Sequence, residues 1–207
     1  MEELGLFLGL GDDANYQLAN PSLLAYYKEL NERRLWLDCE VDDEAIGDMC
    51  RQIIYWNKED DAIELSKRKK IIIYFVSPGG SLDSYLWLKD VINLSITPIV
   101  GIMMSRTASA AALIYLHCHE RYALESAKIL FHYGSISLAQ DAANAIESMK
   151  KYEQEVGKFV DVIREHSDFS GEYIRDKLVK DWELTADEAL EHGIVQKIVS
   201  DISELWN

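Results

Sequence analysis

The 207-residue chain predicts an α/β fold with a parallel sheet, and two observations support that class. Runs rich in β-branched and aromatic residues, such as "KKIIIYFV" at 69–76, are typical of strands buried on both faces. Segments with helical spacing of apolar residues separate these runs, as in crossovers between parallel strands. Apolar residues make up 48% of the chain, enough for the core of one domain.

The chain begins with a segment of little periodicity. Residues 1–20 are rich in Asn, Asp and Gly, and we expect an N-terminal extension to a single domain over 21–207. A helix is predicted over 22–34 because a Pro-Ser start signal precedes it. The apolar run at 34–41 predicts a strand.

The central part alternates helices and strands. Apolar residues at helical spacing and acids in the first turn predict a helix over 42–60. The strand at 69–76 ends abruptly at "SPGGS", and a helix over 81–95 follows with Ser81 as its cap. The next buried strand is predicted over 97–104.

The C-terminal half continues this alternation. "ASAAALIYLHC" predicts a helix over 108–118, and "AKILFHYG" predicts a strand over 127–134. The amphipathic segment 141–166 is longer than a usual globular helix, so we expect it to project and to bury its apolar stripe against a partner. A capped helix and a short strand are predicted within 185–199, with Gly193 as the helix stop.

Charge and cysteine usage limit the functional classes. The net charge of −15 repels phosphate backbones, so we expect no nucleic-acid partner. Three scattered cysteines do not form a disulfide framework and fit a reducing compartment. No signal peptide or apolar run of membrane-spanning length is recognised, which predicts a soluble cytoplasmic protein without a membrane partner.

Two junctions between strands and helices carry groups suited to chemistry. A strand that ends in Pro-Gly-Gly exposes backbone N–H groups that can stabilise an oxyanion, although the motif taken alone more often marks a tight structural turn. Ser109 opens a helix after a buried strand, where its own N–H and that of Ala110 are expected to point outward. A serine packed on the sheet is the alternative, and a nucleophilic serine needs a base.

The chain offers five histidines as that base. His132 ends a predicted strand at the same sheet edge as Ser109. His117 and His119 flank a cysteine, but no second ligand pair accompanies them, so no metal site is predicted. His166 and His192 lie near helix C-termini, where a surface role beside the helix dipole is expected.

Four separated motifs together resemble the Clp (caseinolytic) protease proteolytic subunits, the ClpP family of serine peptidases. The motifs are "YFVSPGGSL", "SRTASAAA", "ILFHYG" and "KDWELTADEALEHGIVQKIV", and the resemblance runs from about Leu23 to Val199. It implies a ClpP/crotonase-like fold built from repeated β-β-α superhelix units, with the long helix as a projecting handle.

The resemblance also implies roles for individual residues. Ser109 corresponds to the nucleophile, His132 to the general base and Asp181 to the acid that orients it. The N–H groups of Gly80 and Ala110 correspond to the oxyanion hole. No metal or cofactor is implied.

Family members assemble into two stacked heptameric rings joined by the handle helices, and a hexameric AAA+ ATPase supplies unfolded substrate chains. The resemblance therefore implies a homo-oligomeric endopeptidase with unfolded proteins and peptides as substrates. The chain departs from the family at Ser105, Arg106 and Thr107 and at the Tyr-Gly pair after His132. Two alternatives stay open: an inactive structural subunit of the ring, and a crotonase-like acyl-CoA enzyme.

Overall fold

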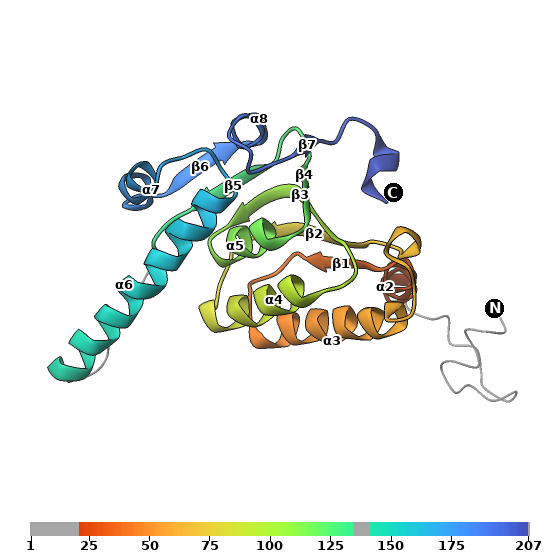
Figure 1. Ribbon diagram of the computed structural model, residues 1–207, viewed down its shortest axis with the longest axis horizontal. Helices are drawn as coiled ribbons and strands as arrows, with labels where there is room; N and C mark the ends of the chain where they lie inside the picture. The colour runs from red at the N-terminus through yellow and green to blue at the C-terminus, as the bar shows by residue number, and fades with distance from the viewer. Residues whose placement is uncertain (1–20, 135–140, 207) are drawn as a thin grey trace, which may run out of the picture. The chain divides into compact units, whose positions relative to one another are not determined.

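The computed structural model describes residues 21–134 and 141–206, and the chain falls into two compact units. The first unit ends at Glu32 and contains α2 (Pro21–Asn31), close to the helix predicted over 22–34. The second unit begins at Arg33 and contains the sheet and the site (Figure 1). The extension predicted for residues 1–20 lies outside the described residues.

The described part of the second unit forms a seven-stranded, mostly parallel sheet (Figure 1). Strands β1, β2, β3, β4 and β7 follow one another in that order, all in parallel pairs. Strand β5 pairs with the second half of β3 in parallel, and β6 adds to β5 antiparallel. The strands are β1 (Arg34–Leu37), β2 (Ile71–Ser77), β3 (Ile99–Ala108), β4 (Glu120–Ala123), β5 (Lys128–Phe131), β6 (Trp182–Thr185) and β7 (Lys197–Ile198).

Strand β3 forks the sheet, and this fork positions the site. Its first half pairs with β4 and its second half with β5, so β3 runs to Ala108 rather than to the predicted end at residue 104. The prediction stopped early because Ser105 and Arg106 are polar and exposed, although the strand continues through buried Thr107 and Ala108.

The helices connect these strands. The three that link the central strands are α3 (Asp43–Asp60), α4 (Leu82–Leu94) and α5 (Ala110–His117). Helix α6 (Ala142–Glu165) extends away from the sheet (Figure 1) and is followed by α7 (Gly171–Leu178) and α8 (Ala186–Glu191). Two short 3-10 helices, η1 (Leu65–Lys67) and η2 (Ile202–Leu205), complete the described elements. The sequence analysis did not predict α7, β4 or β6.

Local signals explain where several helices begin and end. The Asp42 side chain accepts a hydrogen bond from Ala45 N at 2.9 Å, and Ser81 caps α4 as predicted by accepting from Ser84 N at 3.2 Å. Thr185 and Glu188 form a reciprocal capping box at α8. Gly193, predicted as the stop of that helix, has φ +79°.

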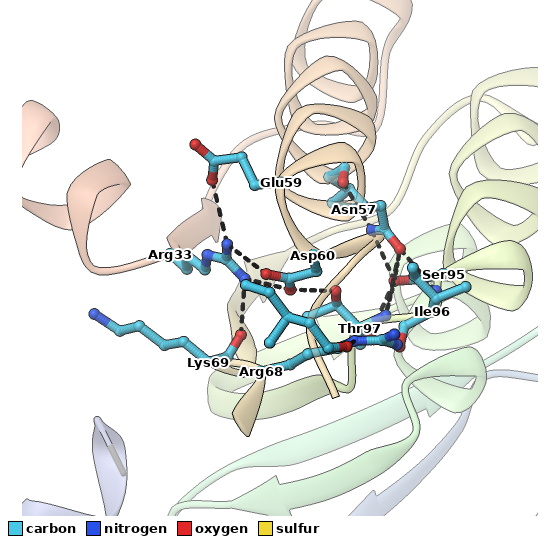
Figure 2. Close-up of polar contacts among 11 residues, drawn as sticks. Arg33, Asn57, Glu59, Asp60, Arg68, Lys69, Ser95, Ile96 and Thr97 are labelled. Atoms are coloured by element: carbon cyan, nitrogen blue, oxygen red, sulfur yellow. Dashed lines mark hydrogen bonds and ion pairs between the residues drawn. The ribbon is translucent and has the colours of Figure 1, made fainter. Parts of the chain in front are cut away.

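A buried ion pair joins the end of α3 to the sheet (Figure 2). Asp60 is 1% exposed and accepts two hydrogen bonds from Arg33, at 2.6 and 3.0 Å, and one from Thr97 Oγ1 at 2.6 Å. Arg33 also donates to the Lys69 carbonyl at 3.1 Å. The hydrogen bonds from Arg33 hold the pKa of the Asp60 carboxyl below its usual value, despite burial.

Candidate active site

Ser109 occupies a strained junction between β3 and α5. It is the N-cap of α5, with φ 55° and ψ −128°, a backbone conformation that non-glycine residues rarely adopt. Its neighbours Ala108 and Ala110 are buried, and their small side chains let the junction pack closely. Strain of this kind concentrates at functional sites, where it fixes a side chain in an unusual direction.

His132 lies next to Ser109 because of the pairing between β3 and β5. Ala108 pairs in parallel with Leu130, so the residues that follow each strand emerge at the same edge of the sheet. The Nε2 atom of His132 lies 2.8 Å from the Ser109 hydroxyl oxygen, a hydrogen-bond distance. This is the geometry that a serine nucleophile and its base require.

Asp181 reaches His132 through the antiparallel pair of β5 and β6. Phe131 pairs with Trp182, so His132 and Asp181 are opposite each other one step beyond the ladder. The Asp181 Oδ1 atom lies 3.5 Å from His132 Nδ1, on the side of the ring away from Ser109. The carboxylate is 71% exposed and the imidazole 32% exposed. The structure therefore brings together the three side chains singled out in the sequence. The contact between His132 and Asp181 is longer than the contact between His132 and Ser109.

The Pro-Gly-Gly turn packs against the nucleophile junction. A side chain on Gly79, whose φ is +94°, would meet Ser109 Cβ at 2.6 Å. Val41 donates to the Gly79 carbonyl and accepts from Ser81 N, both at 2.8 Å. Val41 and Gly80 therefore form an isolated parallel β-bridge. Because the bridge bonds are made by Gly79 and Ser81, the N–H of Gly80 between them points away from Val41.

Ala110 supplies a second N–H on this side. It is the first residue of α5, and the first N–H groups of a helix have no partner within it. A side chain on Gly79 would lie 3.0 Å from Ala110 N, so the glycine turn and the helix start are in close contact. The N–H of Ser109 was expected to point outward as well, and that expectation is wrong. Ser109 N donates to the Leu130 carbonyl at 2.9 Å, because β5 continues its pairing to this point.

A cavity of about 520 Å³ opens beside these groups. Ser109, His132, Gly80 and Ala110 line it together with Glu40. Apolar side chains form much of the remaining wall: Leu82, Leu113, Phe131, Phe159, Ile163 and Leu178. The cavity can therefore hold an apolar side chain next to the serine hydroxyl.

The sequence analysis missed the contribution of α6 to this cavity. Tyr152, Phe159 and Ile163 lie on α6 and line the cavity, whereas the sequence placed the apolar stripe of this helix against a partner only. The spacing of these three residues, 7 and then 4 positions, is a helical period that could have identified one inward face.

The other histidines have structural partners. His119 Nδ1 accepts from Ile99 N at 2.9 Å, and His117 contacts Asn93 Oδ1 at 3.2 Å. Burial lowers the pKa of both His117 and His166 to about 4, so His166 is neutral and does not serve as a charged group beside the helix dipole, contrary to expectation. His192 contacts the Asp168 carboxylate at 2.8 Å.

No group of three or more His, Cys, Asp or Glu side chains in residues 21–134 and 141–206 has an arrangement that could hold a metal ion. Within the same ranges, no helix has both the length and the apolar character needed to cross a bilayer.

Comparison with known proteins gives a consistent result. The family model described as Clp protease matches residues 20–201. The "ATP-dependent Clp protease proteolytic subunit 2" of Corynebacterium diphtheriae is 29% identical over 182 residues, which cover 87% of this chain and 88% of the relative.

Two further relatives show similar values. Subunit 2 of Rhodococcus jostii is 27% identical, covering 87% of this chain and 91% of its own. Subunit 4 of Streptomyces avermitilis is 29% identical, and the match covers 84% of this chain and 76% of that relative. Because the family model spans most of the sequence, and the sheet agrees with the fold expected for that family, the chain belongs to the Clp protease family of serine peptidases.

Proposed function

We propose that this chain is an endopeptidase subunit that hydrolyses peptide bonds of unfolded proteins and peptides with Ser109, His132 and Asp181. The observation that carries the proposal is the 2.8 Å contact between His132 Nε2 and the Ser109 hydroxyl oxygen at the mouth of the cavity. No cofactor takes part in this chemistry.

The reaction begins when His132 Nε2 accepts the hydroxyl proton of Ser109. The Ser109 oxygen attacks the carbonyl carbon of the scissile bond, and the N–H groups of Gly80 and Ala110 stabilise the resulting oxyanion. His132 then donates its proton to the leaving amine, which leaves an ester between the substrate and Ser109. Water, deprotonated by His132, hydrolyses this ester and restores the free serine.

Asp181 supports the base in this scheme. Its carboxylate accepts from the Nδ1–H of His132, which fixes the tautomer that leaves Nε2 free to accept a proton. It also stabilises the imidazolium that forms in each half of the reaction. The apolar wall of the cavity is suited to the substrate side chain beside the scissile bond.

Membership of the family also supports a proposal about assembly and partners. Exposed apolar side chains on α6, including Ile146 at 61% and Met149 at 41%, support burial of this helix against another subunit. We propose a cytoplasmic homo-oligomer of stacked heptameric rings, supplied with unfolded chains by an AAA+ ATPase. The name of the Corynebacterium relative, an ATP-dependent proteolytic subunit, supports that partnership. Sedimentation of the purified chain as a 23.7 kDa monomer would contradict the assembly.

Two serines of the same segment allow a matched test of the activity. Ser109→Ala removes the proposed nucleophile, and Ser105→Ala removes an exposed hydroxyl four residues earlier on β3. Hydrolysis of an unfolded protein should fall by a factor of about 10⁴ or more in the first variant and persist in the second. Equal hydrolysis by Ser109→Ala and the wild type would refute the proposal. Acyl-CoA turnover by Ser109→Ala would instead favour a crotonase-like enzyme.

A further inference from the structure

An aromatic cluster lies directly behind the proposed acid and base. Phe131, Phe169, Tyr173 and Trp182 form this cluster, and Phe131 and Trp182 are the neighbours of His132 and Asp181 in the sequence. Trp182 is 6% exposed and Phe131 is 2% exposed. The sequence alone indicates no role for any of these four residues.

Trp182 is the centre of the cluster. Its ring centroid lies 5.7 Å from that of Phe131, 5.0 Å from that of Phe169 and 5.9 Å from that of Tyr173. Phe169 also lies 4.1 Å from the His192 ring at the end of α8. The Trp182 side chain thus joins β5 to α7 and to the residue that shortly precedes it, through aromatic contacts that each add to the energy of burial.

The pairing of β5 with β6 links the aromatic cluster to His132 and Asp181. Phe131 and Trp182 are the last register pair of β5 and β6, and their side chains meet on one face of the sheet. The next pair, His132 and Asp181, follows directly beyond the end of the ladder. The position of the Asp181 backbone relative to His132 is therefore set by how Phe131 and Trp182 pack.

The Asp181 carboxylate depends on this backbone position to an unusual degree. It is 71% exposed, and its contact with His132 measures 3.5 Å, longer than an ordinary N–H···O hydrogen bond. An exposed carboxylate at this distance has little to hold it against a backbone shift. A displacement of about 1 Å at a reacting group can cost about 100-fold in rate.

We propose that Trp182 is a positioning residue, whose packing against Phe131 holds the Asp181 carboxylate in line with His132. This inference rests on the proposed function, since it concerns the same three side chains. Trp182 does not itself line the substrate cavity, although its neighbour Phe131 does. Loss of Trp182 should therefore lower kcat through Asp181 by a larger factor than it changes KM.

A double-mutant cycle separates positioning from general destabilisation. Trp182→Ala in the wild-type background should lower kcat for a fluorogenic peptide by about tenfold or more, and Trp182→Phe should restore most of that loss. In the Asp181→Ala background, where no carboxylate remains to be positioned, Trp182→Ala should change kcat by less than about twofold. An equal loss in both backgrounds, or no loss in either, overturns the proposal.

A second tryptophan provides the control for stability. Trp56 on α3 is 5% exposed and contacts neither the cavity nor the aromatic cluster, so Trp56→Ala removes a similar side chain at a remote place. At a temperature where both variants are folded and sediment as the wild type does, Trp56→Ala should retain the wild-type kcat. A matching loss of kcat in Trp56→Ala would contradict a role specific to Trp182.

A structural readout tests the inference without any substrate. In a crystal structure of Trp182→Ala, the distance from His132 Nδ1 to the Asp181 carboxylate should exceed that of the wild type, and an unchanged distance would overturn the proposal. If the wild-type protein shows no hydrolysis that depends on Ser109, the proposed function fails, yet this distance still decides whether Trp182 positions Asp181.

Discussion

Replacing Gly79 with alanine should separate the glycine turn from the nucleophile. The added methyl group would lie 2.6 Å from the Ala108 carbonyl oxygen and 2.6 Å from Ser109 Cβ. Real Cβ atoms do not approach backbone atoms this closely, and neither neighbour is the flexible end of a side chain. Gly79 also has φ +94°, which is unfavourable for any residue with a Cβ.

The magnitude follows from these two effects. A non-glycine residue in such a backbone conformation costs about 1–3 kcal/mol. Inserting a methyl group into a packed site costs about 1–3 kcal/mol more, because the backbone must shift. Gly79→Ala should therefore lower the free energy of unfolding by about 2–6 kcal/mol, measured by urea denaturation.

The same shift moves the turn away from Ser109 and Ala110, so activity should fall where the variant is still folded. We expect peptide hydrolysis to decrease by at least about tenfold at a temperature well below the melting transition. Gly157→Ala is the matched control, since a side chain on this α6 glycine would meet nothing within 4 Å. It should raise stability by about 0.5–1 kcal/mol. A Gly79→Ala variant with wild-type stability and activity would refute the packing described for the turn.

Two further predictions concern buried charge and pH. Arg33→Met leaves the Asp60 carboxylate buried without its ion pair, and should lower the free energy of unfolding in urea by about 3–5 kcal/mol; an unchanged midpoint would contradict the network. Burial lowers the pKa of His117 and of His166 from an ordinary value near 6.5 to about 4, so the unfolded chain binds protons first as the pH falls. The free energy of unfolding should therefore reach its full value above pH 6.5 and decrease down to about pH 4. The decrease is on the order of 3 kcal/mol for each histidine before solvent screening of these partly exposed rings reduces it. Denaturation of the His117→Gln, His166→Gln variant should show a weaker pH dependence in this window, and an equal slope would contradict the assignment.

Much of the fold was predictable because its signals are local. The continuous apolar run of β2 identified a buried parallel strand, the apolar spacing and first-turn acids identified α3, and the Ser81 cap marked the start of α4. The elements that were missed carry weak local signals. Strand β6 has four residues, two of them exposed, and its place is set by pairing with β5 rather than by its own sequence.

The candidate site also contains residues that local sequence signals predict and residues whose position depends on strand pairing. Ser109 follows one predicted strand and His132 lies at the end of the next, so the sequence placed both at one sheet edge. Asp181 could be singled out only by resemblance, because its approach to His132 depends on the antiparallel register of β5 and β6. The hydrogen bond from the Ser109 N–H to the Leu130 carbonyl could not be predicted from the sequence either, because it depends on how far β5 pairs along β3.

The most direct test of the central claim is the site of covalent labelling by a fluorophosphonate, which reacts with an activated serine hydroxyl. Mass spectrometry of the labelled wild-type protein should place one adduct on Ser109 and none on the other serines, and His132→Ala should greatly slow its formation. An adduct elsewhere on the chain, or labelling that persists in Ser109→Ala, would contradict the assignment of Ser109 as the nucleophile.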